Sequence, residues 1–457
     1  MSQSTSTIHE PRRRWLAMIP RPLLVVLTIL LVAGAFVTGN ALRAGSDALI
    51  GSEPRSNGGI AAATTSEQIA SLQAQLTTNA GDLDAATTLA SLYLQQARET
   101  GDTGLYGRAG SLLDGVLERE PEHIEALAGQ AALALARHDF LPALDWALRA
   151  RSIQPDSLAV FPVLIDAYVE LGQYDAAVAT ADAFINLKPN LASYTRVAYL
   201  RELYGDPVGA SEALSLALDS VHGGTEPGGW TRVQIGNLYL STGNLDTAER
   251  EYTQTLALLP GYAPAQAGLG RIAAARGDYP LAIELLTDAA TRVPLPEYVI
   301  ALGDVYAVSG NTQAAAEQYA LVQAMTQLLA ANGVNSDLEL ALFAADHPTF
   351  ANGLTPDGTV EQARAALAVR PGIYGHDTLA WALFRAGEYD AAWAESQQAL
   401  QLGTRDALLH YHAGMIANAR GDSNAARLHL GTALSINPHF SILHASDARK
   451  TLAALGR

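Results

Sequence analysis

Apolar and small residues follow one pattern over most of the chain, and the pattern is clearest between residues 263 and 294. On both sides of Gly277 the apolar residues fall at helical spacing, so this stretch predicts two short helices. Gly277 suits the left-handed end of the first helix, Asp278 can cap the second, and Pro294 stops it. Such an antiparallel pair exposes too much apolar surface to be stable alone, and we therefore expect copies stacked on either side.

The turn between the two helices recurs eight times, in steps of 34, 33, 38, 34, 33, 77 and 34 residues. The turn positions are His138, Gly172, Gly205, Gly243, Gly277, Gly310, Gly387 and Gly421. The residue five positions after each turn is always alanine, as in Ala143, Ala177, Ala210, Ala248, Ala282, Ala315, Ala392 and Ala426. Seven positions before the turn the residue is usually small, and Ile165 is the departure. Small residues at both places predict close helix crossings.

This register resembles the tetratricopeptide repeat, whose period is 34 residues with small residues at the same places. The resemblance implies an all-α fold, a right-handed α-solenoid of about ten helix-turn-helix repeats over residues 64–457, whose first helices line a concave face. Irregular repeats are expected near 84–121 and 335–371, a loop at 222–229, and a C-terminal cap helix at 441–455. The last 85 or so residues are also similar to a group of bacterial repeat proteins with no assigned role.

The N-terminal residues predict a membrane anchor. No residue from Pro22 to Leu42 is charged, and 21 residues span about 31 Å as a helix, which matches a bilayer core of about 30 Å. Residues 1–21 form a basic leader that the positive-inside rule keeps in the cytoplasm, so the repeats are expected outside. Residues 43–63 indicate a flexible linker. A cleaved signal peptide ending near Ala35 and a buried soluble helix are the alternatives.

The cysteine count and the net charge exclude several classes of function. The chain has no cysteine, which excludes disulfides, thiolate metal sites and cysteine catalysis. Its formal charge is −17, and residues 61–457 alone carry 23 basic and 43 acidic residues, or −20. An acidic solenoid lacks the clustered basic groups that phosphate contacts need, so no nucleic-acid partner is expected.

Candidate chemistry is sparse. Five histidines fall in the last 48 residues and make a metal site conceivable: His410, His412, His429, His439 and His444. His410 and His412 diverge on a predicted helix, however, and no carboxylate joins them at the spacing of a helical zinc motif. The glycines at 268–270 and 228–229 neither follow a predicted strand nor precede a lysine, so they do not predict a phosphate loop. We expect no cofactor, no small-molecule substrate and no enzymatic activity.

The resemblance also indicates which side chains face a partner, because ligand contacts in this family come from non-core positions of the first helices. The candidates are Tyr199, Trp230, Asn237, Arg271, Asp304, Trp381, Phe384, Tyr411, Met415 and Asn418, with Val233, Leu240 and Ile300 beside them. The lysine and asparagine pair with which some relatives hold a peptide carboxylate is missing. A second interpretation is that the large aromatic residues only pack between repeats.

These observations lead to one main hypothesis and two alternatives. The main one is a membrane-tethered, non-catalytic scaffold in a cell-envelope or secretion-related assembly. Its partner would be a protein or peptide segment with apolar anchors and net positive charge. The alternatives are an accessory subunit of a membrane transporter or synthase, and an enzyme whose site the sequence does not reveal.

Overall fold

Helices account for nearly all of the structure. The computed structural model describes residues 64–350 and 355–456, and within them it contains α-helices α3 to α24, one short 3₁₀ segment (Pro348–Phe350) and no β-strand. The predicted membrane helix, its leader, the linker and the alternative cleavage site all lie outside the described residues. Within the described part of the chain, no helix combines the length and apolar character needed to cross a membrane.

The helices form ten consecutive pairs, each with a first and a second helix, as the solenoid prediction requires. The first helices of the pairs are α4 (Leu83–Thr100), α6 (Ile124–Ala136), α8 (Val160–Glu170), α10 (Leu191–Leu203), α12 (Glu226–Ser241), α14 (Ala263–Ala275), α16 (Pro296–Val308), α18 (Asp337–Asp346), α20 (Ile373–Ala386) and α22 (Ala407–Ala419). The second helices are α5 (Gly104–Leu117), α7 (Phe140–Ile153), α9 (Tyr174–Leu187), α11 (Pro207–Asp219), α13 (Leu245–Leu258), α15 (Tyr279–Arg292), α17 (Thr312–Ala331), α19 (Pro356–Val369), α21 (Tyr389–Ala399) and α23 (Ser423–Ile436). A single helix lies at each end of the described chain, α3 (Thr65–Thr78) and α24 (Ala445–Leu455).

The repeated small residues pack as the register predicts. All eight alanines that follow the turns are at most 2% exposed. At Gly236 a Cβ atom would lie 2.5 Å from the ring of Tyr252, which comes from the second helix of the same repeat. Ile165 reverses this arrangement, because the residue at the place of Tyr252 in its repeat is the small Ala181, and both are buried in one cluster. A large side chain on either helix is thus matched by a small one on the other.

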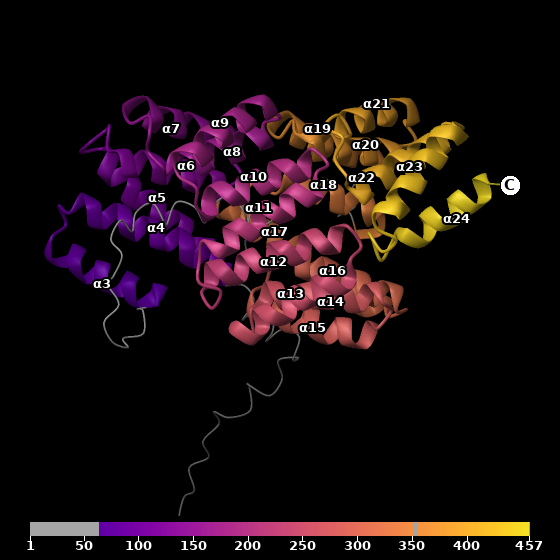
Figure 1. The fold of residues 1–457 in the computed structure, drawn as a ribbon, viewed down its shortest axis with the longest axis horizontal. Coiled ribbons are helices and arrows are strands. Elements are labelled where there is room, and N and C mark those ends of the chain that lie inside the picture. The colour runs from indigo at the N-terminus through magenta and orange to yellow at the C-terminus, as the bar shows by residue number, and fades with distance from the viewer. Residues whose placement is uncertain (1–63, 351–354, 457) are drawn as a thin grey trace, which may run out of the picture.

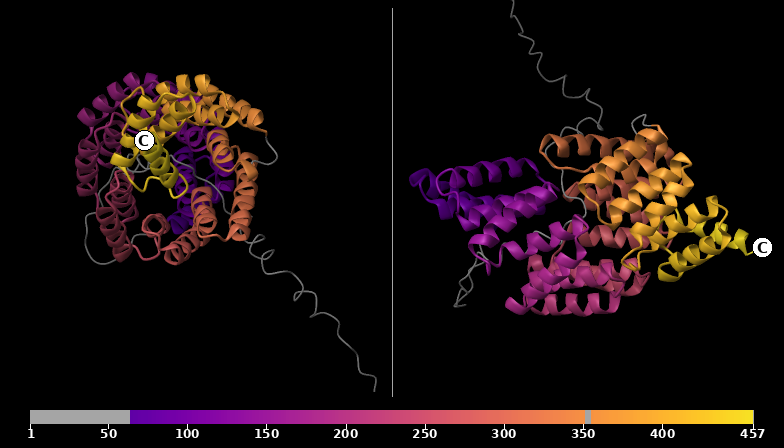
Figure 2. Two further views of the ribbon diagram at one scale, coloured as in Figure 1. Left: turned by 90° about the vertical axis from the view of Figure 1, so that its right-hand side faces the viewer. Right: turned by 90° about the horizontal axis from the view of Figure 1, so that it is seen from above.

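The stack of repeats winds around an axis until it meets itself. Figure 1 shows the N-terminal helices at one end and the C-terminal helices at the other, with α9 beside α19 although they are far apart in sequence. The view along the long axis shows a ring, with the C-terminal helices in front of the N-terminal ones (Figure 2). We call residues 64–331 the first gyre and residues 332–456 the second gyre.

Four successive turns of the first gyre dock on loops of the second, and we call this line of contacts the seam. Its hydrogen bonds join residues 197 to 201 positions apart. They link His138 Nδ1 and the Asn335 carbonyl (2.7 Å), the Ile373 N–H and Tyr174 hydroxyl (2.7 Å), the Thr404 hydroxyl and Leu203 carbonyl, and the Asn437 amide and Leu240 carbonyl (2.9 Å). The cavity left beside Tyr174 measures about 10 Å³, which leaves room for no more than about one water molecule.

A buried charge cluster completes the seam. The guanidinium of Arg370, only 4% exposed, contacts Glu170 of the first gyre at 2.9 Å and Glu339 of the second at 2.7 Å. The same group lies over the ring of Phe140, 5.2 Å from its centroid. Burial opposes ionisation of Glu339, but Arg370 outweighs it and lowers the pKa of Glu339 below its ordinary value.

Two irregularities in the repeat pattern contact each other. The first irregularity is helix α4, which has 18 residues where α6 has 13. The second is helix α17, which has 20 residues where α15 has 14. The Asn332 amide at the end of α17 donates to the Thr103 hydroxyl at 3.0 Å. Leu105 and Leu329 belong to the same buried cluster. The extra residues therefore start the second gyre against the first repeats.

Two predicted boundaries need correction. The loop expected at 222–229 is shorter, because α12 begins at Glu226 with the Thr225 hydroxyl capping it. The cap helix expected at 441–455 begins at Ala445, and residues 437–444 instead form a turn. Asn437 Nδ2 donates to the Leu240 carbonyl, so this turn lies against the first gyre and cannot belong to a solvent-facing cap.

Candidate functional site

One position of each first helix supplies most of the predicted partner-binding residues. It lies six residues before the turn, and its occupants include Tyr199, Asn237, Arg271, Asp304, Trp381 and Met415. The structure brings Asn237, Arg271 and Asp304 together, because all three line one cavity of about 320 Å³. Tyr199 lies at the seam beside Tyr374. We call the surface formed by these positions the inner face.

The aromatic candidates are mostly buried. Trp230, Trp381 and Tyr411 are 6%, 2% and 3% exposed, while Phe384 and Met415 are partly buried and Asn418 is exposed. Trp381 stacks on His412 with ring centroids 4.2 Å apart and on Phe384 at 4.7 Å. This arrangement agrees with the interpretation that these residues pack between repeats, and any contact of theirs with a partner stays a prediction.

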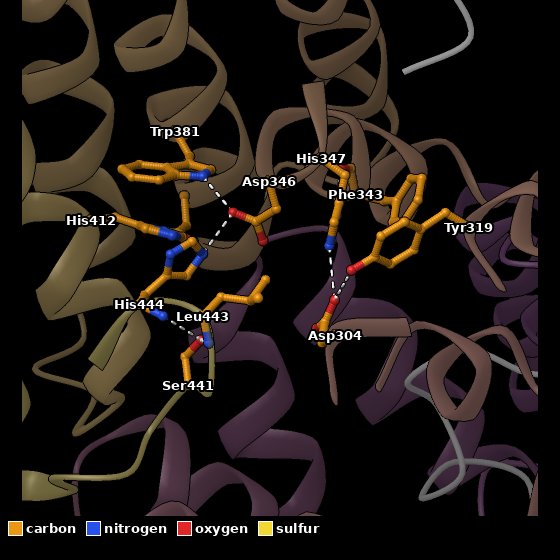
Figure 3. A network of polar contacts seen from close by, with 11 residues as sticks. Asp304, Tyr319, Phe343, Asp346, His347, Trp381, His412, Ser441, Leu443 and His444 are labelled. Carbon is orange, nitrogen blue, oxygen red and sulfur yellow. Dashed lines mark hydrogen bonds and ion pairs between the residues drawn. The ribbon is translucent and has the colours of Figure 1, made fainter. Parts of the chain in front are cut away.

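Two carboxylates, Asp346 beside Trp381 and Asp304 beside Tyr319, accept the polar contacts at the end of α18 (Figure 3). Asp346 accepts a hydrogen bond from Trp381 Nε1 at 2.8 Å and lies 3.0 Å from His444 Nε2. Asp304 accepts a hydrogen bond from the Tyr319 hydroxyl at 2.8 Å and lies 2.9 Å from His347 Nε2. Asp346 and His347 are adjacent at the end of α18, so this helix end connects α20 and the C-terminal turn with α16 of the first gyre.

His412, which stacks on Trp381, forms a buried pair with Asp377. His412 Nδ1 lies 2.9 Å from Asp377 Oδ2, and the two residues are 0% and 3% exposed. Burial opposes protonation of His412, but the Asp377 carboxylate outweighs it and raises the pKa of His412. His412 Nε2 is buried without a hydrogen-bond partner. Since no hydroxyl contacts that nitrogen, the pair does not form part of a serine-type catalytic set in the described residues.

The remaining C-terminal histidines do not converge on a metal. His410 Nδ1 and His429 Nδ1 lie 3.1 Å apart, and burial lowers the pKa of both rings, that of His410 to about 4. His439 lines the 320 Å³ cavity instead. Among the described residues, no group of three or more side chains has the geometry of a metal site.

Sequence reasoning missed the groups that hold the two gyres together. Arg370 and its two glutamates come from α8, α18 and the end of α19, and no spacing in the sequence relates them. It also missed the C-terminal turn, whose residues 437–442 lie against the inner face of α12, α14 and α16. Both features arise from the winding of the superhelix, which a repeat register does not reveal.

Comparison with known families identifies the repeat. A family model of the tetratricopeptide repeat matches residues 233–295, which span two of the turns found in the sequence, Gly243 and Gly277. The two matched helix pairs are tetratricopeptide repeats. In tetratricopeptide-repeat terms, α12 to α15 are two consecutive repeats, and the same register extends through the other helix pairs. A search of curated proteins found no match.

Several solved structures are similar in fold. Yeast Tom70 is 13% identical, with 86% of this chain and 92% of that chain covered and a TM-score of 0.36. The human IFIT1 dimer with PPP-AAAA is 14% identical, with coverage of 81% and 86% and a TM-score of 0.45. The Cut9–Hcn1 complex of the APC/C is 18% identical, with coverage of 86% and 94% and a TM-score of 0.33.

Proposed function

We propose that this protein is a non-catalytic scaffold that holds another protein against the inner face of its first gyre. The tetratricopeptide repeat supports this, because such repeats form extended surfaces for binding proteins. The observation that carries the proposal is the row of equivalent side chains at Tyr199, Asn237, Arg271 and Asp304. These four stay partly exposed, whereas Trp381 and Tyr411 of the second gyre are buried.

The charge of the solenoid indicates the kind of partner. Residues 61–457 carry a formal charge of −20, so a segment with net positive charge is attracted over long range and associates faster. Apolar side chains of the partner would anchor it on the inner face. Binding is then expected to weaken with salt, mainly through the association rate.

We further propose that residues 22–42 anchor the solenoid in a membrane, with the leader in the cytoplasm and the repeats outside. This rests on the uncharged 21-residue segment and on the arginines before it. An envelope or secretion-related assembly suits such a scaffold, and an accessory subunit of a transporter or synthase is the alternative. Protease added to spheroplasts should digest the repeats, and full protection would contradict the orientation.

Site-specific photocrosslinking tests the scaffold proposal. A benzoylphenylalanine at Asn237 should crosslink a defined partner in intact cells, whereas the same group at Val208, which is 69% exposed on the outer surface, should not. Both variants must first show the helical circular dichroism and melting midpoint of the natural chain. Equal crosslinking from both positions, or from Val208 alone, would move the binding surface away from the inner face.

A further inference from the structure

The cavity on the inner face has two walls from distant parts of the chain. Helices α12, α14 and α16 form one wall and the turn at 437–442 forms the other, with about 320 Å³ between them. Small side chains at Ala274, Ala275 and Ala301 leave this space open. A volume of this size lies at the lower end of the range for small-molecule pockets, which is roughly 300–1,000 Å³.

Arg271 is the cationic group on the cavity wall. In the described part of the chain it makes no hydrogen bond and no ion pair, unlike the arginines at 196, 232 and 370, each of which contacts a carboxylate. Burial raises the pKa of the nearby Glu297, and the charge of Arg271 acts in the opposite direction. The guanidinium is thus free to bind an anion with two parallel hydrogen bonds.

Other groups on the walls also offer donors. The Ser441 oxygen accepts the backbone N–H groups of Leu443 and His444, which leaves its own hydrogen free to donate. The Asn237 oxygen accepts from the Tyr252 hydroxyl at 2.7 Å, and its amide nitrogen donates one hydrogen to Gln234 Oε1 at 3.5 Å, which leaves the second amide hydrogen to donate. Asp304 is the one carboxylate on the wall, and it is paired with His347, whose pKa is raised because Asp304 outweighs the effect of burial.

Most of the remaining wall is apolar, although Ser241, Asn437 and His439 also line it. Leu240, Leu286 and Val305 come from the first gyre, and Phe440 and Ile442 come from the turn. A ligand that satisfies both parts of the wall needs an apolar body and one negatively charged oxygen pair. A carboxylate has this shape, because its two oxygens match the planar fork of a guanidinium.

We propose that this cavity binds a small organic carboxylate with an apolar body, held by Arg271 and enclosed by the turn at 437–442. The ligand would contact both gyres and so hold the last contact of the seam, between Asn437 and Leu240, in place. The turn closes one side of this cavity, which gives the cavity the size of a small-molecule pocket, and a partner protein would contact the inner face outside it. This inference goes beyond the scaffold function and does not depend on it.

Calorimetry with the full chain in detergent provides the test. The probe is 3-phenylpropionate, and 3-phenylpropanamide is its uncharged counterpart of the same shape. We expect saturable binding of the carboxylate, at least tenfold weaker binding of the amide, and a similar loss in Arg271→Gln, because a charge-assisted pair contributes on that scale. Arg276→Gln, which removes an arginine paired with Asp246 and Glu249 on the outer surface, should bind like the natural chain.

Two further measurements keep the result interpretable. Ala275→Leu fills the cavity without changing charge and should also abolish binding, and circular dichroism must show that each variant is folded. A peptide with a free C-terminal phenylalanine, compared with its amidated form, tests the polypeptide source of the same chemistry. Equal binding of 3-phenylpropionate and its amide, unchanged affinity in Arg271→Gln, or binding of the free peptide but not of 3-phenylpropionate would each overturn the proposal.

Discussion

The hydroxyl of Tyr174 accepts a hydrogen bond from the backbone N–H of Ile373 at 2.7 Å, although 199 residues separate the two. Neighbouring repeats in a solenoid meet along their helices, but this contact joins a turn of one gyre to a loop of the next. The same relationship recurs at the three other seam contacts. The superhelix is therefore closed on itself over at least four repeats, and the predictions below test that closure and its consequences.

Breaking the charge cluster should destabilise the whole fold. In Arg370→Met the carboxylates of Glu170 and Glu339 remain buried without a cation, which should lower the free energy of unfolding by about 3–5 kcal/mol. The measurement is urea denaturation followed by circular dichroism. Arg276→Met is the control, because its ion pair is 39% exposed on the arginine side and should contribute about 0–1 kcal/mol. Equal effects would mean that the seam adds no stability.

A pair of glycine substitutions separates the seam from backbone strain. Gly172 and Gly277 both have positive φ, 69° and 82°, so alanine costs about 1 kcal/mol at either position. A Cβ atom at Gly172 would also lie 2.6 Å from the Pro371 carbonyl oxygen, while one at Gly277 would meet nothing within 4 Å. We expect Gly172→Ala to lower the free energy of unfolding by about 1–3 kcal/mol more than Gly277→Ala. If the two variants have equal melting midpoints, the turn at Gly172 does not lie as close to Pro371 as the structure shows.

Replacing Trp381 and Phe384 by alanine distinguishes packing from partner binding. Trp381 is 2% exposed and hydrogen-bonded to Asp346, so the double variant should lose about 3–5 kcal/mol of stability. Its folded fraction should bind a captured partner with unchanged affinity, as isothermal titration at low temperature can show. Lower affinity with an unchanged melting midpoint would instead assign these residues to the binding surface.

Stability should depend on the protonation of Glu202. Burial, and then the nearby Asp406 carboxylate, raise the pKa of Glu202 from 4.5 to about 7. Between these values the folded chain retains a proton that the unfolded chain has lost, so the contribution to stability falls as pH rises from 4.5 to 7 and is constant above that. Glu202→Gln should flatten this part of the pH profile of the melting midpoint. Glu212→Gln, exposed on the outer surface, should leave the profile as it is.

The repeat register was predictable because it follows from neighbours in the chain. Ala282 and its equivalents are buried at the expected helix crossings, and the turn residues have the left-handed conformation expected of them. His138 shows the limit of prediction from the repeat register. It keeps a positive φ of 61° without being glycine, and its ring contacts the Asn335 carbonyl across the seam. The register predicted the turn at His138, but no local pattern predicted that contact.

The candidate site was less predictable, because it depends on how the gyres meet. Asn237, Arg271 and Asp304 share a surface, as the register implied, but the turn that covers them lies about 170 residues after Arg271. Trp381 occupies the same register position and is nevertheless buried, because α18, α22 and the C-terminal turn supply Asp346, His412 and His444 around it. Equivalent positions in a repeat thus have different environments once the superhelix closes.

The seam also changes how the chain reaches its native state. A typical repeat array has almost only short-range contacts, so it can nucleate anywhere and lose its end repeats one at a time. Here four contacts span 197 to 201 residues, and such loops must close before the contacts form. During synthesis the first gyre can fold early, but its turns at His138 to Gly243 wait for residues 335 to 437 to leave the ribosome.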